Sequence, residues 1–317
     1  MMVYLTGLLG LAILLLAGDA LVKGAVNLAL RLGVPALIVS LTIVAFGTSA
    51  PELLISIKAA LEGAPGIALG NVVGSNTANV LLVLGIPAML AVMHTSSHDT
   101  RKSFWIMLAA TFLFIGLAFR GVFDWIAGLI LVGVLAVILG DAFRDSLKHR
   151  NGALEGAEDD EDLEGADPDM AWWKVLLFLA LGLVGLPVGA DLLVDSARVI
   201  ATRFGVSDTV IGLTLVAIGT SLPELATTVS AALRKQADVA LGNVIGSNMF
   251  NLLAIIGVAS LIAPIDVDPE FLRFDLWVML AASLLLIPFV LMGRDLTRAW
   301  GIGLTLLYAA YVAYVLS

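Results

Sequence analysis

Two glutamates stand alone in long apolar segments of the chain. Glu52 is the only charged residue between positions 35 and 57, and Glu224 is the only one between positions 210 and 233. Each glutamate ends the same short pattern, Gly-Thr-Ser-x-Pro-Glu. A carboxylate deep in a bilayer is costly, so such a residue usually faces a partner, water or a bound ion. The pair therefore predicts an ion site within the membrane.

The residues around each glutamate also fit the start of a helix. Both motifs match the capping box S-x-x-E, with a proline in the first turn. A helix that starts at mid-membrane depth must follow a break, since Pro51 lacks an N–H and Gly47 loosens the preceding turn. Carbonyls near Ala45 and Thr48 can then face a cavity, where irregular backbone is tolerated. The cap and the ion site are compatible, and the break favours the ion site.

The apolar segments that follow each motif carry amides and hydroxyls but no charge. Ser75 and Asn79 are four residues apart and share one helix face, as do Ser247 and Asn251. We expect these four side chains to face the glutamates. The other asparagines of these segments are expected to join helices, a common role of polar residues in membranes. They are Asn71, Asn76, Asn243 and Asn248.

The ligands available in these segments are all oxygens: two carboxylates, two amides, several hydroxyls and backbone carbonyls. Such a set suits hard cations such as Ca²⁺, which binds about 6–8 oxygens. Softer metals prefer His or Cys, but the chain has no cysteine, and His94, His98 and His149 fall in predicted loops. No Ser–His pair or H-E-x-x-H motif can be assembled in these segments, which disfavours a membrane hydrolase.

Composition shows what must position these residues. Of the 317 residues, 60% are hydrophobic and only 14% charged, and the mean hydropathy is +1.03. These values exclude a soluble globular protein and predict an all-α polytopic membrane protein with about ten transmembrane helices. The first stretch is read as a helix rather than a signal peptide, because no Lys or Arg precedes it. The predicted stretches are residues 3–17, 35–57, 67–93, 104–119, 123–139, 172–194, 206–233, 239–265, 271–292 and 299–316.

An internal repeat organises these helices. Residues 41–52 align with residues 213–224, and residues 70–79 align with residues 242–251, both at an offset of 172. Each half holds five helices, an odd number, so the second half must enter the membrane from the opposite side. This predicts two inverted five-helix repeats, with helices 2 and 7 broken, as in many secondary transporters. The domains are residues 1–140 with a motif in 41–79, a linker at 141–171, and residues 172–317 with a motif in 213–251.

The net charge of −9 arises from the linker. Nine acids and no base lie between positions 151 and 170, so 17 of the 26 acids remain to balance 17 Lys and Arg. The linker is expected to be a solvated connector, because it lacks the EF-hand spacing of a Ca²⁺ sensor. Dividing the 17 Lys and Arg gives twelve on the linker's side and five opposite, which places the linker in the cytoplasm and both termini outside. The acidity also argues against nucleic acid as a partner.

The paired motifs, GTSAPE with GNVVGSNTAN and GTSLPE with GNVIGSNMFN, resemble the two alpha-repeats of the cation/calcium antiporter superfamily, in particular its prokaryotic sodium/calcium exchangers. The resemblance implies that Glu52 and Glu224 bind Ca²⁺ with the backbone carbonyls of Thr48 and Thr220. It implies Na⁺ sites formed by the hydroxyls of Thr48, Ser49, Ser75, Thr220, Ser221 and Ser247, the carbonyls of Ala45 and Ala217, and, at the centre, Asn79 and Asn251. Potassium-dependent members carry an aspartate at one of the two central positions. Asparagine at both positions weakens a potassium or proton role.

This family membership would make the chain an antiporter of the plasma (inner) membrane with Ca²⁺ and Na⁺ as substrates, and with no cofactor, nucleic acid or obligate protein partner. Two ionised glutamates give the site a charge of −2, so one Ca²⁺ would neutralise it and the family's load of three Na⁺ would leave +1, which makes exchange electrogenic.

The first and sixth helices would slide past the rest, with Asp19 and Asp191 at their ends in interfacial positions. An H⁺/Ca²⁺ antiporter is the nearest alternative, and the hydroxyls beside each glutamate favour Na⁺. A passive channel would need no paired broken helices.

Overall fold

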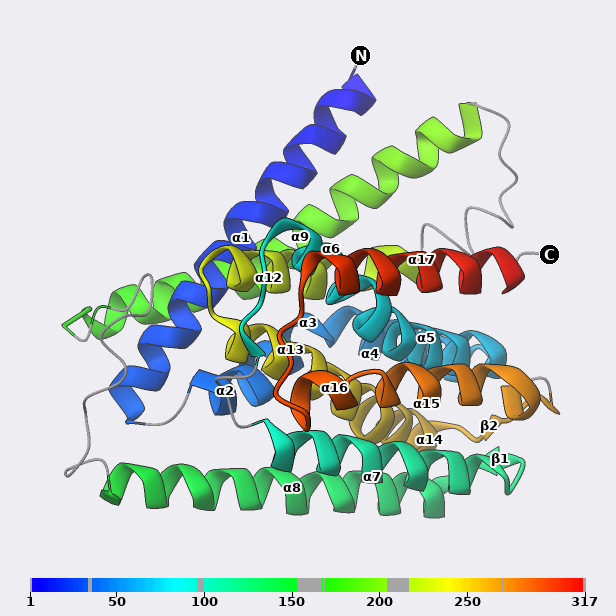
Figure 1. Cartoon of the computed structure of the whole chain (residues 1–317). Coiled ribbons are helices and arrows are strands. Elements are labelled where there is room, and N and C mark those ends of the chain that lie inside the picture. Colours follow the sequence, from blue (N-terminus) through cyan, green and yellow to red (C-terminus); the bar gives the residue numbers. More distant parts are fainter. Residues whose placement is uncertain are drawn as a thin grey trace.

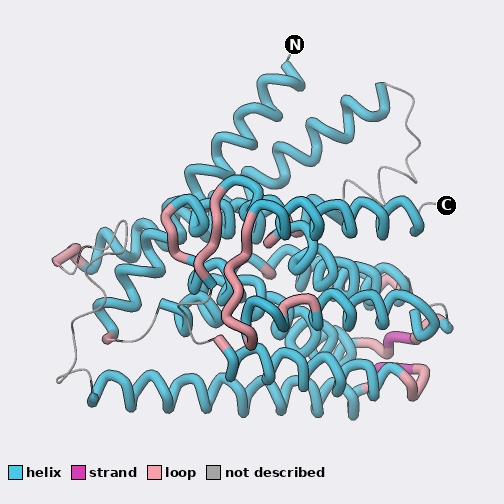
Figure 2. The backbone as a smooth tube through the Cα atoms, in the orientation of Figure 1, coloured by secondary structure: helices cyan, strands magenta, loops and turns pink. Residues whose placement is uncertain are grey.

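The computed structural model describes residues 2–33, 36–95, 100–152, 167, 169–203, 217–269 and 271–315. Almost all of these residues lie in helices, which pack side by side as a bundle (Figures 1 and 2). The first part of the chain forms α1 (Met2–Leu32), α2 (Ala36–Val39), the π-helix η1 (Ser40–Val44), α3 (Ala45–Thr48), α4 (Ala50–Leu61), α5 (Pro65–Ala78), the π-helix η2 (Asn79–Val83), α6 (Gly85–Leu90), α7 (Arg101–Ala118), β1 (Val122–Phe123) and α8 (Trp125–Gly152).

The second part of the chain repeats the central elements of the first. It forms α9 (Trp172–Arg203), α11 (Ala217–Thr220), α12 (Leu222–Leu233), α13 (Ala237–Phe250), the π-helix η5 (Asn251–Ile255), α14 (Ile256–Ile262), β2 (Ile265–Asp266), the π-helix η6 (Phe271–Asp275), α15 (Leu276–Leu284), α16 (Ile287–Val290) and α17 (Arg298–Val315). The helices α3, α4, α5 and η2 recur as α11, α12, α13 and η5, and every boundary is shifted by the offset that relates the two sequence motifs. The repeat found in the sequence is thus kept by the secondary structure around both glutamates.

Seven helical stretches of the described residues are long and apolar enough to cross a membrane, and the bent pair Ser40–Thr48 and Ala50–Leu61 would make an eighth. The sequence predicts ten. The stretch predicted at 206–233 is covered only in part, because residues 204–216 lie outside the described residues. The stretch predicted at 299–316 corresponds to α17, which begins at Arg298, contains three tyrosines and is less apolar than the seven.

The helices α1 and α9 are longer than predicted and cross each other as a close pair on one side of the bundle (Figure 1). They were expected at residues 3–17 and 172–194 but continue to Leu32 and Arg203. Glycines make the crossing possible: a Cβ atom on Gly10 would lie 2.8 Å from the Gly189 carbonyl, and one on Gly24 would lie 2.8 Å from the Leu179 nitrogen. Such small residues allow helix backbones to approach closely in membranes. We therefore treat α1 and α9 as one unit.

The hydrophobic core lies around α5 and α13, and every residue of α13 is buried. Outer helices pack onto this core through glycines, as where a Cβ atom on Gly128 of α8 would lie 2.8 Å from the Gly257 carbonyl of α14. The antiparallel strands β1 and β2 pair Val122 with Asp266 and so tie the two parts of the chain together.

The helix α8 continues through Gly152, well into the segment predicted as a linker from residue 141. Its first turn is capped by Asp124, whose carboxylate accepts a hydrogen bond from the Ala127 N–H at 2.9 Å. That hydrogen bond lowers the pKa of the Asp124 carboxyl, with Arg120 contributing. Near the other end, Lys102 of α7 lies 2.7 Å from Asp141 of α8. The acidic residues 155–164 of the predicted linker lie outside the described residues.

Candidate cation site between the two repeats

Glu52 and Glu224 lie in the first turns of α4 and α12, directly after a local break in the helix. Ser49 and Ser221, which precede α4 and α12, have nearly the same backbone angles, φ −84° and ψ 6° against φ −86° and ψ 3°. The helix axis bends by 52° between Ser40–Thr48 and Ala50–Leu61. Both glutamates are almost fully buried, with exposed fractions of 1% and 0%. The repeated sequence thus places two carboxylates in equivalent buried positions.

An asparagine on the following helix holds the backbone of each glutamate. The Asn71 amide donates to the Glu52 carbonyl at 3.1 Å and to the Ser56 hydroxyl at 2.9 Å. At the equivalent place the Asn243 amide donates to the Glu224 carbonyl at 3.3 Å and to the Thr228 hydroxyl at 3.1 Å. The expectation that these asparagines join helices agrees with these bonds.

Hydroxyls cross from one repeat to the carboxylate of the other. The Ser49 hydroxyl donates to Oε1 of Glu224 at 3.1 Å. The neighbouring Thr48 hydroxyl lies 3.4 Å from Oδ1 of Asn243 and 3.5 Å from the Ser247 hydroxyl. In the opposite direction Thr220 lies next to the carboxylate of Glu52. These contacts bring the two motifs, which are far apart in the sequence, into one site.

The predicted capping boxes are wrong in one respect. Among the described residues, neither Ser49 nor Ser221 makes a side-chain capping bond to its own helix. The Ser49 hydroxyl instead donates across the site to the buried carboxylate of Glu224. A buried carboxylate without a hydrogen bond costs more free energy than an N–H without one at the start of a helix.

The centre of the site is formed by asparagines from α5, α13 and the π-helices that follow them. Asn76 and Asn248 donate to each other's backbone carbonyls at 3.4 and 3.5 Å, and the Asn79 amide donates to Oδ1 of Asn248 at 3.1 Å. Asn251 is fully buried at the equivalent of Asn79. The asparagines therefore fix the distance between α5 and α13 next to the carboxylates.

Six buried atoms of the predicted site residues have no hydrogen-bond partner among the described residues. They are Oε2 of Glu52, Oε2 of Glu224, Oγ of Ser221, Oδ1 of Asn79, and both amide atoms of Asn251. A buried polar group without a partner costs about 1–3 kcal/mol, so such groups are rare in native structures and call for an explanation such as an ion. Five of the six atoms are oxygens, the ligands that hard cations prefer.

The remaining predicted ligands differ in their availability. Ser75 and Ser247 are buried, as expected. The Ala45 carbonyl was expected to be free, but it accepts hydrogen bonds from the Ser49 N–H at 3.0 Å and from the Thr48 hydroxyl at 3.2 Å. In the other repeat the Ser221 N–H donates to the Ile218 carbonyl at 3.1 Å. The Ala45 carbonyl is therefore already hydrogen-bonded in this conformation.

Sequence reasoning missed the π-helices that begin at both central asparagines. The π-helix η2 starts at Asn79 and η5 starts at Asn251. A π-turn widens a helix by one residue and often marks a functional site. No residue type in the motif predicts this wider turn. Once the π-helix of one repeat was known, the internal repeat would have predicted the other.

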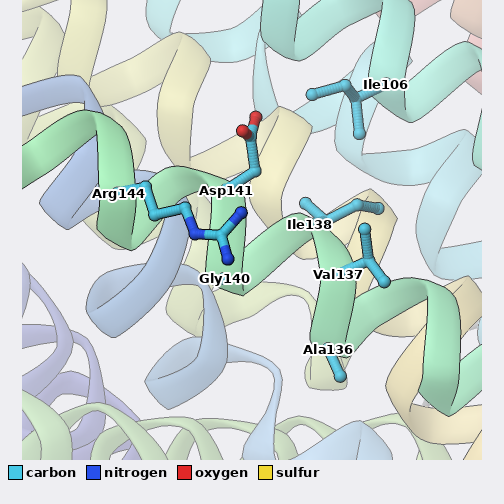
Figure 3. Close-up of a pocket in the computed structure, with 7 residues that line it drawn as sticks. All are labelled: Ile106, Ala136, Val137, Ile138, Gly140, Asp141 and Arg144. Atoms are coloured by element: carbon cyan, nitrogen blue, oxygen red, sulfur yellow. The ribbon is translucent and has the colours of Figure 1, made fainter.

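No group of three or more His, Asp or Glu side chains that could hold a metal ion occurs among the described residues. A cavity of about 610 Å³ lies elsewhere, against α7 and α8, where Figure 3 shows Ile106, Val137, Ile138, Asp141 and Arg144 along it. The lining residues do not include either glutamate, so this cavity is separate from the candidate site.

A model of the family described as "Sodium/calcium exchanger protein" matches residues 2–142 and 174–317. The sodium/calcium exchanger MaX1 of Methanosarcina acetivorans is 36% identical over 98% of this chain and 97% of its own length. The Ca²⁺/H⁺ antiporter ChaA of Bacillus subtilis is more distant, at 25% identity over 83% of this chain and 78% of its own length.

A solved structure of the sodium-calcium exchanger NCX_Mj, soaked with Na⁺ and Ca²⁺, superposes on this chain with a TM-score of 0.83. The two sequences are 32% identical, and the match covers 99% of this chain and 98% of that one. Sequence and fold therefore agree over essentially the whole length, including both motifs.

Proposed function

The chain belongs to the sodium/calcium exchanger family, and on this premise we propose that it exchanges Na⁺ for Ca²⁺ by alternating access at the site of Glu52 and Glu224. The resemblance inferred from the paired motifs is confirmed, and the protein is a membrane-embedded secondary transporter of the cation/calcium antiporter class rather than an enzyme. The observation that carries the proposal is the cluster of buried oxygens without partners around two carboxylates from different repeats.

The proposed Ca²⁺ ligands are the carboxylates of Glu52 and Glu224, with the carbonyls of Thr48 and Thr220. In support, each carboxylate keeps one oxygen without a hydrogen bond among the described residues, and Oε1 of Glu224 accepts a hydrogen bond from the Ser49 hydroxyl. A hydroxyl can turn its lone pairs to an arriving cation without any change of the backbone. The central amides of Asn79 and Asn251 would complete the site.

The proposed Na⁺ ligands use the same groups together with the hydroxyls of Ser75, Ser221 and Ser247 and the carbonyls of Ala45 and Ala217. The Ala45 carbonyl would become available when the Thr48 hydroxyl, now 3.2 Å away, turns toward an ion. Because both cations share the glutamates, they compete, and competition at one site enforces exchange.

The charge of the site supports electrogenic exchange. No Lys or Arg occurs in residues 41–57, 65–93, 217–233 or 237–265, which form the site and its surroundings, so two ionised glutamates are balanced only by bound cations. One Ca²⁺ gives a neutral site, whereas three Na⁺ give a net charge of +1. A three-to-one exchange would therefore move charge across the membrane.

Coupling of Ca²⁺ transport to protons instead of Na⁺ is the alternative function, and two observations support testing it. The relative ChaA is a Ca²⁺/H⁺ antiporter by name, and two buried carboxylates can be neutralised by protons as well as by cations. The Thr-Ser pair beside each glutamate favours Na⁺, because hydroxyls coordinate Na⁺ but add nothing to proton exchange.

We further propose that the chain crosses the bilayer ten times, as two inverted repeats, with both termini outside and the acidic linker in the cytoplasm. The recurrence of the secondary structure at the same offset as the sequence motifs supports the repeat, and the distribution of Lys and Arg supports the orientation. The unit of α1 and α9 would slide past the other helices between the two open states.

The test is radioactive Ca²⁺ uptake into proteoliposomes, with an outward Na⁺ gradient, an outward proton gradient or none. We expect uptake with the Na⁺ gradient alone, increased by an inside-positive potential that draws out the extra positive charge. Uptake driven by protons would replace this proposal with the alternative. Uptake without either gradient would indicate a channel.

A further inference from the structure

The helix α1 meets α12 through one close contact, which we call the α1–α12 contact and define by Gly18, Asp19, Ala226, Ser230 and Arg234. A Cβ atom on Gly18 would lie 2.8 Å from the Ala226 carbonyl and 3.1 Å from the Ser230 hydroxyl, so only glycine fits there. One residue later, Oδ1 of Asp19 accepts a hydrogen bond from Nε of Arg234 at 2.6 Å, and the two side chains form an ion pair. Asp19 was expected at the end of a helix but lies within α1.

The α1–α12 contact covers one face of the helix that carries Glu224. Ala226, Ser230 and Arg234 are spaced four residues apart and form a single stripe along α12, beginning two residues after Glu224. Ala226 and Ser230 are each only 6% exposed. Because residues two apart do not share a helix face, this stripe lies on a different face of α12 from Glu224, and α1 holds α12 from that face.

The equivalent positions in the other repeat are arranged differently. Subtracting 172 from Ala226, Ser230 and Arg234 gives Leu54, Lys58 and Glu62 on α4. Leu54 is 69% exposed, and the side chains of Lys58 and Glu62 are 75% and 63% exposed and form a loose pair with each other at 3.8 Å. The helix α9, which is the repeat counterpart of α1, packs against α12, α3 and α11 but makes little contact with α4.

The residues themselves make the two arrangements unequal. The counterparts of Gly18 and Asp19 are Ala190 and Asp191 on α9. If α9 lay on α4 as α1 lies on α12, Ala190 would meet the larger Leu54, and Asp191 would face Glu62 instead of an arginine. Lys58 is the nearest base on the stripe, but it already pairs with Glu62.

We infer that Asp19 and Arg234 are positioning residues that hold α1 on α12, so that the exchanger favours the state in which α1 lies on α12 over the state in which α9 lies on α4. This inference rests on the alternating access of the proposed function. It makes the resting equilibrium a property of this chain's own charges, since the opposite state lacks an equivalent ion pair.

The chain contains no cysteine, so a single introduced cysteine reports on this equilibrium without background. In the variant Ser230→Cys the thiol lies beneath α1 and should react slowly with a maleimide in the detergent-solubilised full-length protein without added Na⁺ or Ca²⁺. Adding Arg234→Gln or Asp19→Asn should raise the labelling rate about fivefold, the ratio that corresponds to about 1 kcal/mol for such an ion pair. The matched control is Glu62→Gln at the equivalent exposed position, which should leave the rate unchanged.

Two further variants separate charge from packing. Exchanging the partners, as Asp19→Arg with Arg234→Asp, should restore slow labelling of Ser230→Cys. The variant Glu62→Arg should raise the labelling rate, because it would give Asp191 of α9 an ion-pair partner next to α4. Folding should not be affected, because Glu62 is exposed.

Equal labelling rates in Arg234→Gln and in the parent would overturn the inference, as would failure of the exchanged pair to restore protection. These readouts do not depend on transport. If the labelling shifts but Na⁺ drives no Ca²⁺ uptake, the positioning role stands and the proposed function fails. If Na⁺ drives uptake but labelling does not respond, only the positioning role fails.

Discussion

Around the glutamates the two repeats can be compared atom by atom. Asn71 and Asn243 each donate one amide to a glutamate carbonyl and to a hydroxyl four residues beyond the glutamate. The two repeats differ in how α1 contacts α12 and how α9 lies relative to α4. Arg234 pairs with Asp19 of α1, whereas its counterpart Glu62 pairs only loosely with Lys58 on its own helix.

This contrast separates two requirements of an exchanger. The ligands must stay equivalent, because both sides of the membrane use one site. The contacts that close the two routes need not be equivalent, and their difference in free energy sets which side is open at rest. The repeat is therefore kept where ions would bind and has diverged where helices would move.

The most severe way to break the equivalence is to remove one carboxylate at a time. Glu52→Gln and Glu224→Gln should each reduce Ca²⁺ uptake into proteoliposomes to the level of empty liposomes, since either change leaves the site with a charge of −1 against a divalent ion. Size-exclusion profiles should stay unchanged because glutamine has nearly the same shape. Glu62→Gln serves as the control. Uptake near the normal rate in either variant would disprove the assignment of that glutamate.

A smaller effect is expected from the asparagines that hold the glutamate backbones. Asn71→Ala removes two hydrogen bonds, and Asn243→Ala removes three because Oδ1 of Asn243 also accepts from the Thr48 hydroxyl. Each variant should lower the free energy of unfolding by about 1–3 kcal/mol. Asn243→Ala should cost more, because Asn243 is fully buried whereas Asn71 is partly exposed. Thermal unfolding in detergent measures both.

Ser56→Ala and Thr228→Ala remove only one of these bonds in each repeat and provide the matched controls. They should lower the unfolding temperature less than the asparagine variants do. Equal shifts for all four variants would show that the hydrogen bonds to the glutamate carbonyls contribute nothing.

The mildest change sharpens the comparison at the centre of the site. Asn251→Asp breaks no hydrogen bond among the described residues, whereas Asn79→Asp replaces the amide that donates to Asn248. We therefore expect Asn251→Asp to keep the unfolding temperature of the parent but to make Ca²⁺ uptake fall more steeply as the pH is lowered, because the added carboxylate must be ionised to bind the cation.

Asn79→Asp should instead lower the unfolding temperature, since an ionised carboxylate there would face an acceptor oxygen. Uptake and unfolding measured side by side distinguish the two variants. If the pH profile of Asn251→Asp matched that of the parent, Asn251 would not line the site.

Much of this arrangement could be predicted from the sequence because the repeat is expressed in local motifs. The constant offset between the paired motifs, the isolation of Glu52 and Glu224, and the break at Pro51 all follow from short-range patterns. These patterns identified the membrane class, the family and the elements that carry the glutamates.

Long-range features escaped prediction for physical reasons. The bond from Ser49 to Glu224 depends on how two distant motifs face each other, so a local capping rule gave the wrong partner. The true ends of α1 and α9 were missed because hydropathy falls at Asp19 and Asp191 although the helices continue past them. The π-helices at Asn79 and Asn251 have no signature in residue type.

The short strands β1 and β2 have a mechanical consequence. Their pairing of Phe123 with Ile265 joins the two repeats by backbone hydrogen bonds at one end, and the amides of Asn76 and Asn248 join them in the middle. With two separate points of attachment, the repeats can neither rotate nor shear against each other without breaking bonds. In the proposed mechanism the degrees of freedom left for transport belong to α1 and α9, so a bound ion would stay nearly stationary while the barrier beside it changes sides.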